Sequence, residues 1–106
     1  MKLLISCRDI GAATQLHGFL HMCKKTNHNF DFLVIVQEPS IKIMAEFADI
    51  KLSASSAKTF SVVKDAFDIF QPDFCLVGLS GHGWGVDETI LSYAKTCAVS
   101  TGTIQD

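Results

Sequence analysis

The chain has 106 residues, of which 48% are hydrophobic and 19% charged, a composition typical of a globular domain rather than a disordered tail. This length provides one modest core and no room for a second domain, so we expect one domain over residues 1–106, complete or a fragment of a longer two-domain protein. Nine basic and eleven acidic residues give a net charge of -2, and the basic residues are scattered, so nucleic acid and anionic membranes are not expected partners.

The longest apolar runs, such as residues 32–36, are far too short to span a bilayer, and the first residues lack the pattern of a secretion signal. We therefore expect no membrane span and a cytoplasmic protein. The four cysteines stand far apart in the sequence without a C-x-x-C pair, so we expect them to be reduced and structural. They are Cys7, Cys23, Cys75 and Cys97.

Five segments have the composition of strands. Short continuous apolar runs suit strands buried on both faces of a parallel sheet, and β-branched and aromatic residues favour the extended conformation. The predicted strands cover residues 2–6, 30–36, 49–52, 74–79 and 98–101.

Four segments between these strands carry apolar residues at helical spacing. Ser40, Thr59 and Asp87 stand where their side chains can cap the N-termini of the last three helices. The predicted helices cover residues 11–25, 41–47, 59–70 and 87–96.

The alternation of strands and helices predicts an α/β fold, a three-layer α/β/α Rossmann-like domain with a five-stranded parallel sheet of order 3-2-1-4-5. In this order the first two helices cover one face of the sheet and the last two cover the other. No fifth helix is predicted after the last strand. We therefore expect a bare apolar corner beside strands four and five, which a missing C-terminal domain or a homodimer partner would bury.

Ligands of open α/β sheets bind beyond the carboxyl ends of the strands, at the point where the strand order reverses. The first and fourth strands meet there, so the loops at residues 7–11 and 80–87 form the candidate site. In the first loop, Arg8, Asp9 and Gly11 are candidate ligand-binding residues because they lie beside the amides of a helix N-terminus. Equally well, the small residues here allow close packing of the helix on the sheet.

The second loop has glycine at every second position from Gly81 to Gly85, but it lacks the Lys-Ser/Thr ending of a P-loop and does not match G-x-G-x-x-G. Asp87 and Glu88 at the start of the following helix would repel a phosphate, so hydroxyl groups of a sugar or ribose are the better partners. The candidate ligand-binding residues of this loop are Ser80, Gly81, His82, Gly83, Trp84 and Asp87.

Two side chains of the second loop have a functional and a structural interpretation. Trp84 can stack on a base or a sugar, or it can anchor the loop by packing on the helix beneath, which is the slightly better supported interpretation. His82 can act as a general acid or base, oriented by Asp87 or Glu88. No nucleophile accompanies it, so the catalytic residues stay unassigned.

A metal site is not expected. His17 and His21 share one helix face at a spacing that can hold a metal, but no third ligand stands there and Lys24 shares the face. We therefore expect a solvated surface, and we expect no cofactor.

Residues 3–13 and 72–81, together with 85–88 and 98–101, resemble the N-terminal half of GT-B type glycosyltransferases and of the related sugar-nucleotide 2-epimerases. The resemblance implies an acceptor-side domain of a glycosyltransferase-like or sugar-nucleotide-processing protein, whose C-terminal domain holds most of the nucleotide donor. It also implies a sugar or nucleotide-sugar ligand and little activity for this domain alone. Arg8, Asp9, His82 and Asp87 would line the acceptor side of the cleft.

Two further hypotheses stay open. A stand-alone domain that binds a nucleotide or a flavin would share the strand order of flavodoxin-like proteins. A homodimeric interaction module without catalysis would use the bare corner as its interface. The fold by itself does not choose among these hypotheses.

Overall fold

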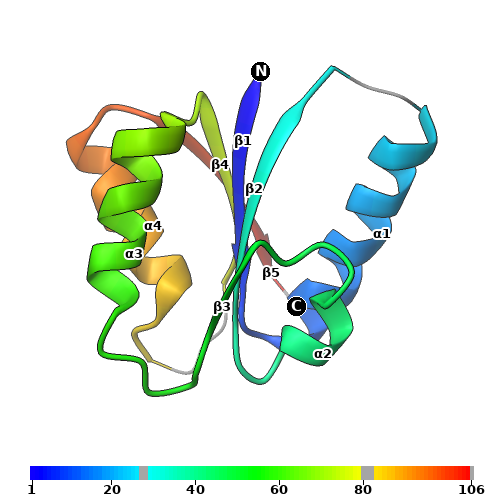
Figure 1. Cartoon of the computed structure of the whole chain (residues 1–106), viewed down its shortest axis with the longest axis horizontal. Helices are drawn as coiled ribbons and strands as arrows, with labels where there is room; N and C mark the ends of the chain where they lie inside the picture. The colour runs from blue at the N-terminus through cyan, green and yellow to red at the C-terminus, as the bar shows by residue number, and fades with distance from the viewer. Residues whose placement is uncertain (27–28, 80–82, 106) are drawn as a thin grey trace.

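The structure is a computed structural model that describes residues 1–26, 29–79 and 83–105. One parallel sheet runs through the middle of the molecule in the order β3-β2-β1-β4-β5, which confirms the predicted topology (Figure 1). The strands are β1 (Lys2–Cys7), β2 (Asp31–Gln37), β3 (Ile50–Leu52), β4 (Phe74–Leu79) and β5 (Ser100–Gln105).

Helices cover both faces of the sheet and complete the predicted three layers. The helices α3 and α4 lie on one side, and α1 and α2 lie on the other, as Figure 1 shows. None of the helices in the described part of the chain has the length and hydropathy needed to cross a bilayer. The helices are α1 (Ile10–Thr26), α2 (Ile41–Met44), α3 (Thr59–Asp65), which continues as the π-helical turn η1 (Ala66–Phe70), and α4 (Val86–Thr96).

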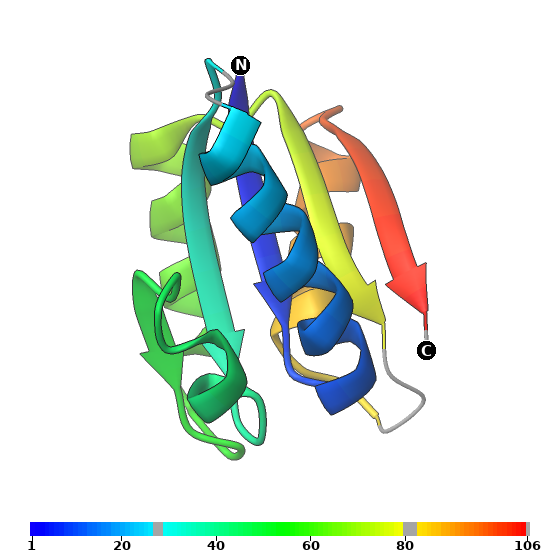
Figure 2. The same ribbon diagram turned by 90° about the vertical axis from the view of Figure 1, so that its right-hand side faces the viewer.

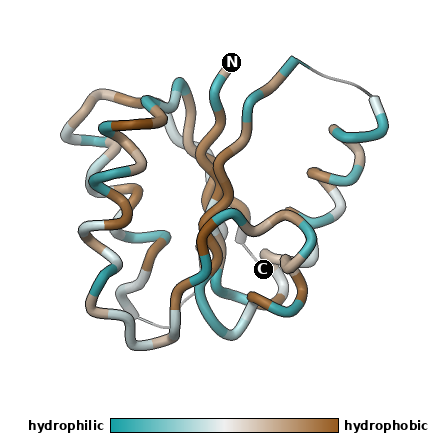
Figure 3. Tube along the Cα trace, in the orientation of Figure 1, coloured by the Kyte–Doolittle hydropathy of each residue, from teal (hydrophilic) through white to brown (hydrophobic). Residues whose placement is uncertain are grey.

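The central strand β1 separates two hydrophobic cores. Because side chains alternate along a strand, Leu4 packs into the core beneath α3 and α4, whereas Leu3 and Ile5 pack beneath α1 and α2. The hydropathy colouring in Figure 3 shows this apolar centre, whereas hydrophobic and hydrophilic residues are mixed along the helices. A strand that is apolar on both faces therefore holds the middle of the sheet.

The prediction that the side chains of Ser40, Thr59 and Asp87 cap their helices is wrong, although Ser40 does stand at the N-cap position of α2. The hydroxyl groups of Ser40 and Thr59 donate instead to the carbonyl oxygens of Arg8 and Ser56, at 2.6 and 3.1 Å. Asp87 stands inside the first turn of α4, which begins after Gly85, and its side chain is buried. Each of these side chains has a hydrogen-bond partner or a buried position that the spacing of residues along the chain does not predict.

The last strand begins two residues later than predicted. Ala98 adopts a left-handed conformation (φ 57°) after α4, so the extended chain starts at Ser100. In Figure 2, α1 lies over the middle of the sheet and β5 extends beyond it. The expected corner is only partly bare, because Phe74, Leu76 and Ile104 are half-buried and a Cβ atom at Gly102 would lie 3.2 Å from the Phe74 ring.

Candidate functional site

The loops after β1 and β4 meet at the point where the strand order reverses. Arg8, the single arginine of the sequence, connects them: its Nη2 donates a hydrogen bond to the carbonyl oxygen of Gly83. The same Nη2 lies 3.5 Å from Oε1 of Glu88, and both side chains are largely buried. The guanidinium group therefore joins the first loop to the backbone of the second and to the first turn of α4.

Asp87 lies beneath this contact and is fully buried. Ser6, near the end of β1, donates its hydroxyl hydrogen to Asp87 Oδ1 at 2.5 Å. The pKa of Asp87 is raised from 3.8 to about 7, mainly because the carboxyl group is buried; the Ser6 hydrogen bond acts to lower this pKa, and the neighbouring charge of Glu88 acts to raise it. A carboxyl group with this pKa can hold or release a proton near neutral pH.

Two buried polar atoms of the site have no hydrogen-bond partner among the described residues. They are Oδ2 of Asp87 and Nε of Arg8, one an acceptor and the other a donor. Buried groups of this kind are costly to leave unpaired, and they are rare in native proteins. The site therefore retains the capacity to form one hydrogen bond of each kind.

Gln37, the last residue of β2, fixes the second loop from the other side. Its Oε1 accepts a hydrogen bond from the Val86 amide at 2.9 Å, and its Nε2 donates to the carbonyl oxygens of Ser53 and Ala54 at 3.0 and 3.3 Å. One buried side chain thus links the strand end to two loops. We did not identify Gln37 or Ser6 from the sequence, although a polar residue closing an apolar strand is a signal that points to both.

Gly85 packs closely against two side chains of the site. A Cβ atom here would lie 2.8 Å from Cζ of Arg8 and 2.8 Å from Oε1 of Gln37, so a larger residue would push these side chains apart. The Gly85 amide donates to Oε1 of Glu88 at 2.7 Å, which caps the start of α4. Glu88, and not Asp87, therefore provides the side-chain cap of this helix.

The first-loop candidates have structural partners of their own. Asp9 caps α1, because its Oδ2 accepts a hydrogen bond from the Ala12 amide at 3.2 Å. Gly11 lies in the first turn of α1 and is partly buried. Ala12 is fully buried, and a Cβ atom at Gly78 of β4 would lie only 2.6 Å from its Cβ, which supports the packing role proposed for the small residues that follow Gly11.

The second-loop candidates are only partly described. Ser80, Gly81 and His82 lie outside the described residues. Trp84 is 71% exposed, and its Nε1 donates to Oγ1 of Thr89 at 2.9 Å. The indole is therefore fixed by one hydrogen bond while most of its surface stays in solvent.

Neither Cys7 nor the pair His17 and His21 provides a nucleophile or a metal site among the described residues. All four cysteines are free, and burial, followed by the charges of Asp87 and Asp9, raises the pKa of the Cys7 thiol to about 12. Cys7 therefore stays protonated and is a poor nucleophile. Nε2 of His17 lies 3.2 Å from Oε1 of Glu46, and the described residues contain no group of three or more potential metal ligands.

Comparison with known proteins shows that two solved structures share the fold of this chain. No family model and no curated protein matches the sequence. A Listeria monocytogenes protein assigned as a UDP-N-acetylglucosamine 2-epimerase superposes with a TM-score of 0.73 and 12% identity, over 97% of this chain and 29% of that one. A second UDP-N-acetylglucosamine 2-epimerase gives 0.69 and 15%, over 98% of this chain and 33% of the other.

The fold resembles that of UDP-N-acetylglucosamine 2-epimerases. The resemblance to an N-terminal Rossmann-like half, expected from the sequence, is thus confirmed at the level of the fold. The chain spans about a third of the length of the structures it matches (29% and 33%). Structural similarity at sequence identities of 12% and 15% shows a shared fold and not a shared chemistry.

Proposed function

We propose that this domain forms the acceptor-side half of a sugar-nucleotide-processing or glycosyltransferase-like protein. The observation that carries the proposal is the contact of Arg8 with Gly83 and Glu88, which joins two loops where the strand order reverses. Proteins of this fold bind ligands at this place. A second domain completes the cleft and holds the nucleotide.

The charges of the site favour a sugar over a phosphate. The only arginine is already paired with Glu88, and Asp9 and Asp87 lie close by. A phosphate would meet the negative charges of these acidic side chains, whereas an uncharged sugar hydroxyl can donate a hydrogen bond to an exposed carboxyl oxygen. The sugar ring of the substrate therefore belongs against this half of the cleft.

The residues divide into ligand contacts and positioning residues. Asp9 and Gly11 are partly exposed and Gly83 is fully exposed, and these three residues contact the sugar. Arg8 and Asp87 are buried and act through the loops they hold. Catalysis requires groups from the second domain, so this domain alone binds weakly and does not turn over substrate.

The proposal is tested by adding ligands to the ¹⁵N-labelled chain and monitoring the amide chemical shifts. N-acetylglucosamine and UDP-N-acetylglucosamine should shift the amides of Asp9, Gly11 and Gly83 saturably, and UDP alone should leave them in place. The Arg8→Ala variant should weaken this response at least tenfold, whereas Lys42→Ala, at an exposed position of α2, should not change it.

Circular dichroism and thermal melting should first establish that both variants are folded. Saturable binding of UDP alone at these amides would contradict the proposal, as would the absence of any response to the two sugar ligands by the folded native chain.

A further inference from the structure

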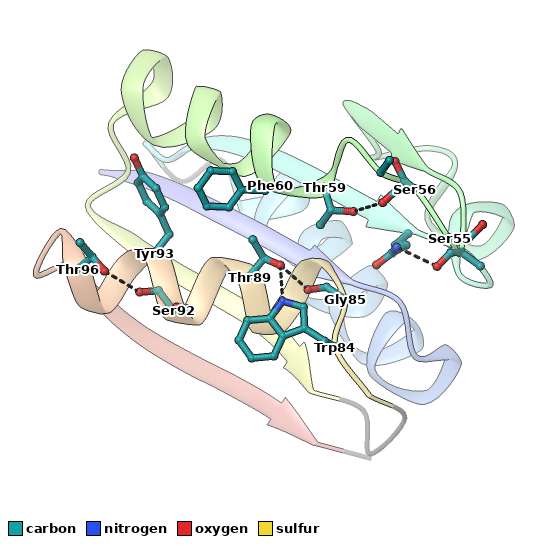
Figure 4. Close-up of a pocket in the computed structure, with 13 residues that line it drawn as sticks. Ser55, Ser56, Thr59, Phe60, Trp84, Gly85, Thr89, Ser92, Tyr93 and Thr96 are labelled. Atoms are coloured by element: carbon teal, nitrogen blue, oxygen red, sulfur yellow. Dashed lines mark hydrogen bonds between the residues drawn. The ribbon is translucent and has the colours of Figure 1, made fainter.

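A second hollow opens on the other side of the loop at Gly83–Val86. It is a groove of about 730 Å³ between α3 and α4, with the loop at residues 54–57 at one end (Figure 4). This volume is in the range of small-molecule sites. We call it the α3–α4 groove. Gln37 and Gly85 contribute to its wall, whereas Arg8, Asp9 and Asp87 do not line it.

The lining of the α3–α4 groove carries no charge. Among the described residues that form it, three are aromatic and six bear an aliphatic hydroxyl group, and none is acidic or basic. An uncharged wall provides no counter-ion for a phosphate, a metal ion or an acidic peptide. The groove therefore selects a neutral ligand.

Two of the three aromatic rings of the groove are exposed, and each of them contacts a neighbouring side chain. Trp84 and Phe60 are 71% and 63% exposed, although large aromatic side chains are usually buried. The Thr89 hydroxyl holds the Trp84 indole at 2.9 Å, and Phe60 meets the edge of Tyr93 at 6.2 Å between ring centroids. Tyr93 in turn packs against Phe67 in the core at 4.9 Å. Rings held in this way can stack on the apolar C–H face of a sugar without losing further freedom.

The threonine hydroxyl groups face the groove mainly as acceptors. Thr59 and Thr96 donate their hydrogens to the carbonyl oxygens of Ser56 and Ser92 at 3.1 and 3.2 Å, and Thr89 donates to Gly85. A hydroxyl group has one hydrogen and two lone pairs, so Thr59 and Thr96 keep acceptor capacity. A ligand rich in O–H donors matches them, and Figure 4 shows such side chains from Thr96 at one end to Ser55 at the other.

We propose that the α3–α4 groove binds a neutral oligosaccharide, with Trp84 and Phe60 as stacking platforms and the threonine hydroxyl groups as acceptors. This site is additional to the one between the loops after β1 and β4. The two are distinguishable because the first would move the amides of Asp9 and Gly11, and this one those of Phe60 and Tyr93.

The probes are maltotriose, cellotriose and tri-N-acetylchitotriose, with the neutral nucleoside uridine as the competing aromatic ligand. The sequence has a single tryptophan, so fluorescence reports directly on Trp84. We expect at least one trisaccharide to change this fluorescence saturably and to shift the amides of Phe60, Thr89 and Tyr93.

Calorimetry on variants identifies the platforms. Trp84→Ala and Phe60→Ala should each weaken trisaccharide binding at least tenfold. Ile69→Ala, at a position 81% exposed and outside the groove, is the matched control and should bind like the native chain. Thermal melting establishes that each variant is folded.

Three results would overturn the proposal. The first is the absence of saturable binding by all three trisaccharides. The second is binding of uridine at these amides more tightly than any trisaccharide. The third is a set of shifts confined to Asp9 and Gly11, which would leave the site between the loops intact and reject the groove.

Discussion

Asp87 shows how burial sets the chemistry of a single carboxyl group in this fold. Its pKa rises from 3.8 to about 7 because it lies without exposure beneath the loops, and the Ser6 hydrogen bond offsets only part of this. Between pH 3.8 and about pH 7, Asp87 keeps its proton in the folded chain and releases it in the unfolded chain. Stability from this group is therefore complete below about pH 4 and is lost as the pH rises through 7.

The Asp87→Asn variant should remove this pH dependence. Asparagine keeps an acceptor oxygen for the Ser6 hydroxyl but carries no charge. Relative to the native chain, the variant should gain stability as the pH rises from 4 to 8, by on the order of 4 kcal/mol at most. Urea unfolding at pH 4.5, 6 and 8 measures this difference.

The matched control is Asp65→Asn, at an exposed position of α3, which accounts for the loss of a negative charge by itself. A constant difference in unfolding free energy between the Asp87→Asn variant and the native chain across this range would contradict the assignment of Asp87 as a buried titrating group.

The contacts of individual side chains decide how much of the site could be predicted from the sequence. The proximity of Arg8 to the start of α4, where Asp87 lies, was predictable, because the loops after β1 and β4 follow strands that adjoin in the predicted order. The links made by Gln37 and Ser6 were not, because their value depends on partners 49 and 81 residues away in the chain. A buried polar side chain acquires a role only when its distant partner is placed beside it.

At the scale of elements, α1 is held unusually close to the sheet. A Cβ atom at Gly78 in β4 would lie 2.6 Å from the Cβ of Ala12 and 3.3 Å from that of Cys7. Such contact leaves no space for a side chain, so the helix would have to move outward. Because Asp9 and Arg8 begin this helix and its loop, the outward movement would also displace the candidate site.

We therefore expect Gly78→Ala to destabilise the chain by about 1–3 kcal/mol through overpacking. The same substitution should cost less in an Ala12→Gly background, because that change removes the atom it meets. A double-mutant cycle from urea unfolding measures the coupling between the two positions.

Gly18→Ala is the control within α1. No atom lies within 4 Å of the Cβ that it would add, so it should be neutral or stabilise the helix by up to about 1 kcal/mol. Equal costs of Gly78→Ala in the two backgrounds would show that α1 and β4 are not in steric contact at this point.

Helix ends were the least predictable elements. Ser40 stands at the N-cap position of α2 and Thr59 is the first residue of α3, but their hydroxyl groups bond to other backbone oxygens. The side chains of Asp9 and Glu88 cap α1 and α4 instead. The N-cap preference is a local energy of about 1 kcal/mol, so a competing contact can replace it. The helical periodicity itself is spread over many residues and is harder to override.

At the scale of the whole molecule, strand order was the most predictable property. It follows from alternation of strands and helices, from right-handed crossovers and from short connections, which together leave few arrangements. The corner beside β5 was predicted less well, because Gly102 allows Phe74 to lie against the strand and cover part of it. That local packing depends on Gly102, which lies outside the last strand as predicted from the sequence (residues 98–101) and inside β5 in the structure.

This architecture also predicts how stability is distributed. Strand β1 lies between β2 and β4, both its neighbouring layers are helical, and Leu4 and Ile5 are fully buried. Strand β3 has three residues, lies at the edge of the sheet and pairs only with β2 among the described strands. Central strands open only when the whole domain unfolds, whereas a short edge strand opens locally.

Native-state hydrogen exchange should therefore find the slowest amides in β1, with opening free energies that approach that of global unfolding. Amides of β3 and of the single-turn helix α2 should exchange at least a hundredfold faster and depend little on urea. Equal protection of β1 and β3 would instead mean that the domain opens as one unit. Because the loop of Arg8 leaves from β1, the predicted pattern places the candidate sugar site on the most stable strand, and the rim of the α3–α4 groove after β3 on the least stable one.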